Sequence, residues 1–477
     1  MSIKVLIHVM KPYFMIKMLT CLLLSSLFLD GSLYAQKKNA IAITHVTIID
    51  VKSGKLKPDM TVVVEGNRIS LVIQSSKIAT RKNEQVINGS GKFLMPGLWD
   101  MHVHSLYAGR PELFFPMFLA NGVTGVREMG SSMPFEKINA IRQQIEKGKL
   151  AGPRFGAVTG KILDDTAWGP EIEAVTTPDE ARSAVKKHKS EGADFIKVYD
   201  GLSRPVYFAI VDEAKKLHIS FAGHLPLSID AAESSDAGQK SIEHLFGIME
   251  ACSSKEQEIK QQPNSNARGE MLLSSFDSTK AHNLFQKFAA NQTYQCPTLS
   301  FIRTLFDVDY DRWLANDPRL EYIPAASREK WKEEMNQMPA SIPWGNNFFL
   351  KLLAIVKEMH ELQVPILAGT DAGLGNPYTF AGFSLHDELA ALVQAGLTPL
   401  QALQTATINP AKFLHKENEF GSIEKRKLAD IVLLNANPLE DIHNTTQIYA
   451  VMSNGKYFSR ADLDRLLADA KAKALEK

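Results

Sequence analysis

The most constraining feature of this sequence is a long alternation of apolar and amphipathic segments between residues 93 and 371. The apolar segments have the length of buried strands, and the segments between them, such as residues 134–148, 177–192 and 204–217, place apolar residues on one helix face. The eight expected strands cover residues 93–104, 122–128, 155–162, 194–199, 219–224, 241–244, 294–299 and 365–371. Alternating strands and helices predict an α/β fold, and eight such units favour a (β/α)8 TIM barrel over an open doubly wound sheet.

Both flanks of this region are rich in strand-forming residues. The N-terminal flank alternates β-branched and polar residues around Ser53-Gly54 and Gly66-Asn67, and the C-terminal flank contains Asn454-Gly455, a strong hairpin turn. We therefore expect the two flanks to pair into one small β-sandwich domain. The expected boundaries are residues 36–94 and 413–460 for the β-sandwich domain, 95–412 for the barrel and 461–477 for a C-terminal helix.

Residues 302–345 are an insertion after the seventh predicted strand. It contains the aromatic residues Tyr310, Trp313, Tyr322, Trp331 and Trp344. A connection of this length is usually functional or disordered, and the aromatic content argues against disorder. Two interpretations remain open, a lid over a site or an aromatic patch packed on the barrel wall.

The N-terminus predicts a secretory signal peptide over residues 1–35. Lys11 and Lys17 precede an apolar stretch at 18–29, and small residues follow at 32–35. The apolar stretch is short for a membrane span, which favours a cleaved signal peptide. An uncleaved N-terminal anchor is the alternative. The mature chain is expected to be periplasmic or secreted and free of the membrane. It keeps Cys252 and Cys296, which form either one disulfide or two free buried thiols.

The charge balance bears on the kind of partner. The formal net charge is +1, whereas proteins that bind nucleic-acid phosphates usually carry a basic surplus. No G-x-G-x-x-G segment opens the first strand–helix unit, which argues against dinucleotide binding. The expected partner is therefore a small-molecule substrate, and a homo-oligomer is compatible with the sequence.

Residues suited to metal binding or proton transfer lie where the predicted strands end. Asp100, His102 and His104 alternate along the first strand and so share one face. Two imidazoles at this spacing can bind one metal ion, whereas a single histidine on an apolar strand is normally structural. Further candidates at the ends of later strands are Lys197, His224, His244 and Asp371. Each alone has a structural explanation, but barrel enzymes keep their chemistry at this end of the strands, so we expect the set to converge.

The motifs that carry these residues resemble the amidohydrolase superfamily. They are DMHVH, DFIKV, AGH, SIEH and AGTDAG, with VREMG after the second strand and the ending GSIEKRKLADIVLLNANP. The resemblance is to the branch of imidazolonepropionase-like enzymes and metal-dependent Xaa-Pro dipeptidases. It implies a hydrolase that cleaves the C–N amide bond of a dipeptide, an N-acyl amino acid or a cyclic amide. One departure is Pro226, where many dipeptidase-like relatives have a histidine that contacts substrate.

Carried over position by position, the resemblance implies a site for two Zn2+ ions. The implied ligands are His102, His104, Lys197, His224, His244 and Asp371. His102, His104 and Asp371 would hold one ion, and His224 and His244 the second. Lys197 would be an N6-carboxylysine that bridges both ions; if it stays unmodified, one ion is expected. Asp371 would also be the catalytic residue that takes a proton from a zinc-activated hydroxide and returns it to the leaving nitrogen.

Contacts with the substrate are predicted for two more residues. Tyr199 shares the face of Lys197 and could donate a hydrogen bond to a substrate oxygen, although a structural role fits equally well. Arg127 could pair with a substrate carboxylate, or with Glu128 or another neighbour. Two alternatives to an amidase also remain open. One is a lactone, ester or phosphotriester hydrolase on the same metal site, and the other is a binding protein without catalysis.

Overall fold

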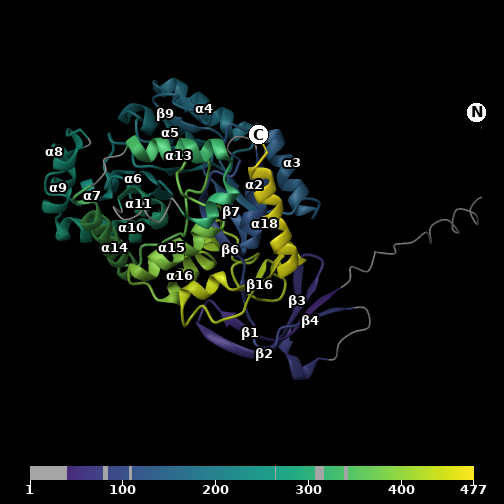
Figure 1. Cartoon of the computed structure of the whole chain (residues 1–477). Coiled ribbons are helices and arrows are strands. Elements are labelled where there is room, and N and C mark those ends of the chain that lie inside the picture. Colours follow the sequence, from purple (N-terminus) through teal and green to yellow (C-terminus); the bar gives the residue numbers. More distant parts are fainter. Residues whose placement is uncertain are drawn as a thin grey trace, which may run out of the picture.

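The computed structural model describes residues 40–78, 84–106, 110–263, 265–306, 316–337 and 342–476. In Figure 1 a body of helices and parallel strands lies beside a β-sheet that both ends of the described chain build. The predicted signal peptide, as well as Tyr310 and Trp313 of the insertion, lies outside the described residues. Within the described ranges, no helix combines the length and apolar character needed to cross a lipid bilayer.

The sheet built by the two flanks contains eight described strands. Their order is β17 (Lys456–Ser459), β16 (Ile448–Ser453), β15 (Ile431–Leu434), β5 (Phe93–Pro96), β1 (Ile41–Asp50), β2 (Lys55–Glu65) and β3 (Arg68–Gln74), with β4 (Gln85–Asn88) also paired to β1. β5 and β15 join the two flanks through an antiparallel register that pairs Pro96 with Ile431. One face of this sheet buries a cluster of apolar side chains that includes Ile43, Val62 and Leu433.

The predicted hairpin at Asn454-Gly455 is confirmed. These two residues connect the antiparallel strands β16 and β17, and their φ angles are 51° and 75°. Positive φ at both central positions is the geometry that matches the natural twist of a two-residue hairpin.

The middle of the chain forms two parallel sheets. One contains β6 (Leu98–Val103), β7 (Val123–Glu128) and β8 (Arg154–Val158). The other has the order β10 (Ile172–Ala174), β9 (Ile162–Asp164), β11 (Phe195–Val198), β12 (Ser220–Gly223), β13 (Ser241–Glu243) and β14 (Tyr294–Cys296). The predicted α/β class with parallel strands is therefore present, but the described strands do not form one continuous closed sheet.

Two of the expected strands are each divided in two. Residues 93–104 become β5 and β6, which belong to different sheets, because the chain turns at Pro96-Gly97. A Cβ atom at Gly97 would lie only 2.0 Å from Oγ1 of Thr124 in β7. Glycine at this position therefore allows the backbone to lie close to β7. Residues 155–162 are likewise divided between β8 and β9.

The eighth expected strand, at residues 365–371, is a connecting segment. The amide of Gln295 in β14 donates to the carbonyl of Pro365, and the amide of Leu367 donates back to Gln295, both at 2.9 Å. On the other side, the amide of Met101 in β6 donates to the carbonyl of Ala368 at 2.9 Å. This segment therefore links the end of the larger parallel sheet to the first strand of the smaller one.

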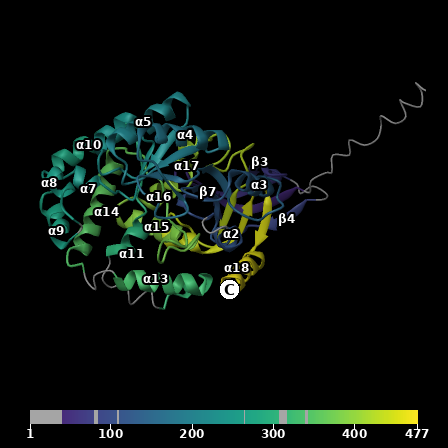
Figure 2. The same ribbon diagram turned by 90° about the horizontal axis from the view of Figure 1, so that it is seen from above.

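Helices surround the parallel strands, as the view in Figure 2 shows for α4, α5, α10 and α14. The expected helices are found as α3 (Phe135–Glu146), α4 (Pro178–Glu191), α5 (Arg204–Lys216), α10 (Ser278–Asn291) and α14 (Gly345–Glu361). The helices beyond these include α2 (Pro111–Ala120), α15 (Phe383–Gln394) and α18 (Arg460–Ala474). α18 lies beside α2 in both views, and Arg110 donates a hydrogen bond to the carbonyl of Lys473 at 3.2 Å. Cys252 and Cys296 are both buried and free.

The described part of the insertion packs against the loop that follows Asp371. It contains α11 (Leu299–Phe306), a 3-10 turn (Pro318–Tyr322) and α13 (Ala325–Gln337). Trp331 of α13 is buried in an apolar cluster with Tyr378 and Phe380, and its indole N–H donates to the carbonyl of Leu374 at 2.9 Å. Through Trp331, the insertion thus packs against the loop that directly follows Asp371.

Candidate metal centre

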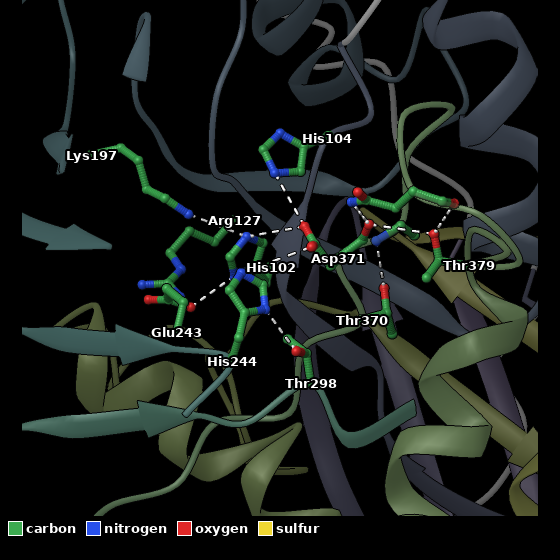
Figure 3. A network of polar contacts seen from close by, with 12 residues as sticks. His102, His104, Arg127, Lys197, Glu243, His244, Thr298, Thr370, Asp371 and Thr379 are labelled. Atoms are coloured by element: carbon green, nitrogen blue, oxygen red, sulfur yellow. Dashed lines mark hydrogen bonds and ion pairs between the residues drawn. The ribbon is translucent and has the colours of Figure 1, made fainter. Parts of the chain in front are cut away.

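Five of the six predicted ligands lie at the C-terminal ends of four strands, and Asp371 lies on a connecting segment. His102 lies on β6, His104 directly after it, Lys197 on β11, His224 after β12, His244 after β13 and Asp371 on the connecting segment. Parallel strands point the same way, so these ends meet at one mouth of the fold. In Figure 3, His102, His104, His244 and Asp371 point toward one another, and Lys197 reaches toward His102.

Asp371 lies at the centre of this group. Its Oδ1 atom is 3.2 Å from Nε2 of both His102 and His104, and its Oδ2 atom is 3.8 Å from Nε2 of His244. The Nζ atom of Lys197 is 3.3 Å from Nε2 of His102. Ligand atoms of His102, His244 and Asp371 all lie within 4.8 Å of one another, so one ion can reach them together.

His224 joins the group from the side of His244. The two imidazole rings have centroids 4.8 Å apart, and the ring of Tyr199 stacks on His224 at 3.9 Å. Gly223 lets this strand end approach Lys197, because a Cβ atom there would lie 3.1 Å from Cδ of Lys197 and 2.2 Å from a backbone carbonyl. The structure therefore brings all six predicted ligands into one neighbourhood.

Acceptor groups hold the second nitrogen of three of these imidazoles. Nδ1 of His102 donates to Glu243 at 2.8 Å, and Nδ1 of His224 donates to Asp200 at 2.9 Å. Nδ1 of His244 lies 2.8 Å from the hydroxyl of Thr298. When the proton is on Nδ1, the lone pair is on Nε2. These contacts therefore leave each Nε2 in the form that can bind a metal ion.

Glu243 belongs to a buried ion pair. One nitrogen of the Arg127 guanidinium lies 3.0 and 2.9 Å from its two carboxylate oxygens, and another nitrogen donates to the hydroxyl of Ser241 at 2.8 Å. The side chains of Arg127 and Glu243 are completely buried. Arg127 is thus oriented into the protein, with Glu243 rather than Glu128 as its partner, and its guanidinium is not available to a substrate carboxylate.

The backbone around the site has unusual conformations that fix these side chains. His244, Thr298 and Asp371 have φ angles of 61°, 47° and 60°, in the left-handed region that residues other than glycine rarely adopt. Such strain persists only where the surrounding structure holds it in place. Asp100 does part of this, because its carboxylate accepts hydrogen bonds from the hydroxyl of Thr370 at 2.6 Å and from the amide of Thr370 at 3.1 Å.

Burial and charge set the protonation of the group. Burial, and then the charge of Lys197, lower the pKa of His102 well below its ordinary value, and burial likewise lowers the pKa of His244. Burial acts to lower the pKa of His104, but the nearby carboxylate of Asp371 raises it overall. Burial lowers the pKa of Lys197 to about 8. Burial opposes ionisation of Asp371, but the nearby histidines and Lys197 keep its pKa below the ordinary range. The carboxylate of Asp371 is therefore ionised near neutral pH.

The residues that our sequence reasoning missed are those that orient the ligands. Glu243 directly precedes His244, so strand alternation would put the two on opposite faces. The left-handed backbone of His244 breaks that alternation and turns its side chain to the same side. Asp200 could have been found, because it directly follows the candidate Tyr199. No local pattern connects Thr298 with His244 or Thr370 with Asp100.

Comparison with known proteins agrees with this fold. The amidohydrolase family profile matches residues 325–457. Imidazolonepropionase from Alkaliphilus oremlandii (strain OhILAs) is 24% identical over 443 residues, which cover 85% of this chain and 93% of that protein. The solved structure of bottromycin amidohydrolase has a TM-score of 0.72 and 22% identity, covering 94% of this chain and 95% of that one. A Xaa-Pro dipeptidase with bound methionine has a TM-score of 0.65 and 24% identity, covering 88% and 100%. These two structural likenesses show the shared fold.

Family profile, related sequence and fold point the same way. Together they support the amidohydrolase superfamily for this chain, in its imidazolonepropionase- and dipeptidase-like branch, and a hydrolase that acts on carbon–nitrogen bonds.

Proposed function

We propose that this hydrolase depends on bound zinc and cleaves the amide bond of a dipeptide, an N-acyl amino acid or a cyclic amide. The observation that carries the proposal is the position of Oδ1 of Asp371. This buried atom accepts no hydrogen bond from any described residue, and it lies 3.2 Å from Nε2 of both His102 and His104. An ionised carboxylate oxygen without a donor, beside imidazole nitrogens, fits a cation between them.

The donor set supports zinc in particular. Zn2+ binds imidazole nitrogens together with carboxylate oxygens, whereas Mg2+ and Ca2+ favour oxygen ligands alone. His102, His104 and Asp371 would hold one ion, and His224 and His244 the other. The orienting contacts of Glu243, Asp200 and Thr298 support this assignment, because ligating histidines usually have such partners.

We also propose that the neutral amine of Lys197 adds carbon dioxide and loses a proton, and that the resulting carbamate would help to hold both ions. An ammonium group would repel two dications, whereas a carbamate is an anion. Lys197 is buried and adjacent to His102, which supports a role inside the site rather than at the surface. Without the modification we expect one ion.

A bound divalent metal would lower the pKa of a water molecule and polarise the substrate carbonyl. Asp371 is placed to move the proton, because its ionised carboxylate lies among the proposed ligands and can accept a proton from that water. It would then deliver the proton to the leaving nitrogen. The left-handed backbone at Asp371 and the hydrogen bond from Asn376 to its carbonyl at 2.7 Å hold this carboxylate in position.

We also infer that one eight-stranded barrel, beside the β-sandwich domain, is formed by residues 365–372 and the seven strands β6, β7, β8, β11, β12, β13 and β14. The support is the hydrogen bonding of this segment to both β14 and β6, and that of the amide of Asp194 to the carbonyl of Val158 at 2.9 Å, between β11 and β8. Cleavage of residues 1–35 during export is a further proposal. Mass spectrometry of the N-terminus of the protein from its native cells would test it.

Metal analysis and a substrate screen test the proposed function. The purified protein should contain one or two zinc ions per chain, and chelation should abolish turnover that zinc then restores. A library of dipeptides, N-acyl amino acids and cyclic amides should contain substrates. Activity confined to lactones or phosphotriesters would move the assignment to the alternative chemistry. Turnover that survives complete removal of metal would contradict the proposal.

A further inference from the structure

A half-exposed tryptophan lies at the rim of the candidate centre. Trp168 is on the loop between β9 and β10, and 55% of its surface is exposed. Single exposed apolar residues are common, so exposure alone says little. Trp168 is nevertheless fixed, because its indole N–H donates to Asp164 at 3.2 Å. Asp164 is itself buried, and it also accepts a hydrogen bond from the amide of Gly201 at 2.9 Å.

The ring of Trp168 continues a series of rings that begins inside the site. Its centroid lies 5.5 Å from that of Tyr199, and Tyr199 stacks on His224 at 3.9 Å with an angle of 27°. Tyr199 follows β11, two residues after Lys197, so this series runs along the strand ends. It forms an aromatic wall (Trp168, Tyr199 and His224) from a proposed metal ligand to the surface.

The charges beside this wall are negative. The carboxylate of Asp164 accepts the indole N–H of Trp168 at 3.2 Å, and the carboxylate of Asp200 accepts a hydrogen bond from Nδ1 of His224 at 2.9 Å. Glu171 is 7% exposed, and its Oε2 atom has no hydrogen-bond partner among the described residues. A carboxylate on a bound molecule would be repelled here, because like charges in a partly buried site repel strongly.

We propose that Trp168 and Tyr199 form a subsite for a flat apolar side group of the substrate, an aromatic ring. This inference rests on the proposed function and names its substrate class, amides of aromatic amino acids. Aromatic rings stack in offset or edge-to-face contacts that contribute beyond simple burial. Because the indole is already oriented, little side-chain freedom is lost when a second ring covers it. The acidic surroundings add discrimination against substrates with an acidic side group.

Hydrolysis of N-acetyl amino acids by single variants tests the subsite. In Trp168→Ala, kcat/KM for N-acetyl-L-phenylalanine should fall about three- to tenfold, mainly through KM, since an aromatic pair contributes this much. The value for N-acetyl-L-alanine should change less than about twofold, and Trp168→Phe should recover most of the loss. Leu350→Ala, which removes an apolar residue that is 49% exposed on α14, is the matched control and should affect neither substrate.

The opposite results would overturn the subsite. An equal loss for the phenylalanine and alanine substrates would show that Trp168 supports the fold rather than a ring. A loss confined to N-acetyl-L-arginine would show that the rim recognises positive charge. A wild-type preference for N-acetyl-L-glutamate would contradict the proposed effect of the carboxylates.

A binding measurement separates this inference from the proposed function. Calorimetry in EDTA, with the fold checked by circular dichroism, would measure binding of N-acetyl-L-phenylalanine and N-acetyl-L-alanine. Tighter binding of the phenylalanine compound that Trp168→Ala removes supports the subsite even if no amide is hydrolysed. Equal binding of both compounds contradicts it even if amides are hydrolysed.

Discussion

The two sides of the candidate centre are held in different ways. His102 donates to Glu243, which is completely buried and paired with Arg127. His224 donates to Asp200, whose side chain is 42% exposed. A buried ion pair breaks at high cost when one partner is removed, whereas an exposed carboxylate is solvated and can move. The difference indicates that the core fixes the His102 side, while the His224 side adjoins solvent.

Asp371 connects the two sides, and its substitution should have the largest effect. Asp371→Asn keeps the size of the side chain but removes its charge and its basicity. We expect kcat to fall roughly 100- to 10,000-fold, the usual contribution of a positioned general base. Steady-state kinetics with zinc content measured on the same sample would check this. A variant that keeps its zinc and its full turnover would exclude Asp371 as the proton carrier.

Removing the charge of Glu243 tests the fixed side. In Glu243→Gln, zinc affinity measured against a chromophoric chelator should fall about 10- to 100-fold, because the orientation of His102 is weakened. The variant also leaves Arg127 buried without its counter-charge, which typically costs about 3–5 kcal/mol of stability.

A double variant separates these two effects of Glu243. Arg127→Met with Glu243→Gln removes both charges, so thermal stability should largely recover while zinc affinity stays low. Recovery of zinc affinity together with stability would mean that the ion pair supports only the fold.

The solvent side should respond less. Asp200→Asn keeps an acceptor near Nδ1 of His224, and water can replace part of the lost interaction. We expect zinc affinity to fall by no more than about tenfold, the lower end for such orienting partners. Chelator competition on Asp200→Asn and Glu243→Gln side by side is the measurement. An equal or larger loss in Asp200→Asn would remove the contrast between the two sides.

The contrast between local and distant interactions also decides what the sequence could predict. Helix 177–192 was predictable because the residues that begin and end it lie next to it in the sequence. In the structure Thr177 caps the start of α4, and Gly192, with a φ of 111°, caps its end. The six proposed ligands were predictable because each lies at or near the end of an apolar segment, in a recognisable motif. The pair of Arg127 and Glu243 was not, since 116 positions separate the two residues and either could have paired elsewhere.

The division of two predicted strands has a similar cause. Pro96-Gly97 and Thr159-Gly160-Lys161 contain turn-forming residues that mark possible breaks, but the local sequence does not show which sheet each half joins. The breaks follow from which neighbours are available for pairing, β15 for β5 and β7 for β6. That information depends on chain segments far away in sequence.

The smallest effect on zinc is expected at Glu388 of α15, a carboxylate of the same burial as Glu243. It accepts a hydrogen bond from the amide of Ser300 at 2.7 Å and contacts no proposed ligand among the described residues. Burial raises its pKa to about 8 from an ordinary value of 4.5. The folded state therefore holds a proton that the unfolded state releases above pH 4.5. The contribution of this proton to the free energy of unfolding is complete below pH 4.5. It is lost as the pH rises toward 8, by up to about 1.4 kcal/mol per pH unit.

Glu388→Gln removes this titration and leaves the centre intact. Unfolding by denaturant between pH 5 and 8 should show a flatter pH dependence in this variant than in the wild type, and zinc affinity should stay within about twofold because no ligand loses its orienting partner. The variant is therefore the matched control for Glu243→Gln. If both variants lost zinc affinity equally, the loss would follow from removing any buried carboxylate. It would then not depend on the specific contact between Glu243 and His102.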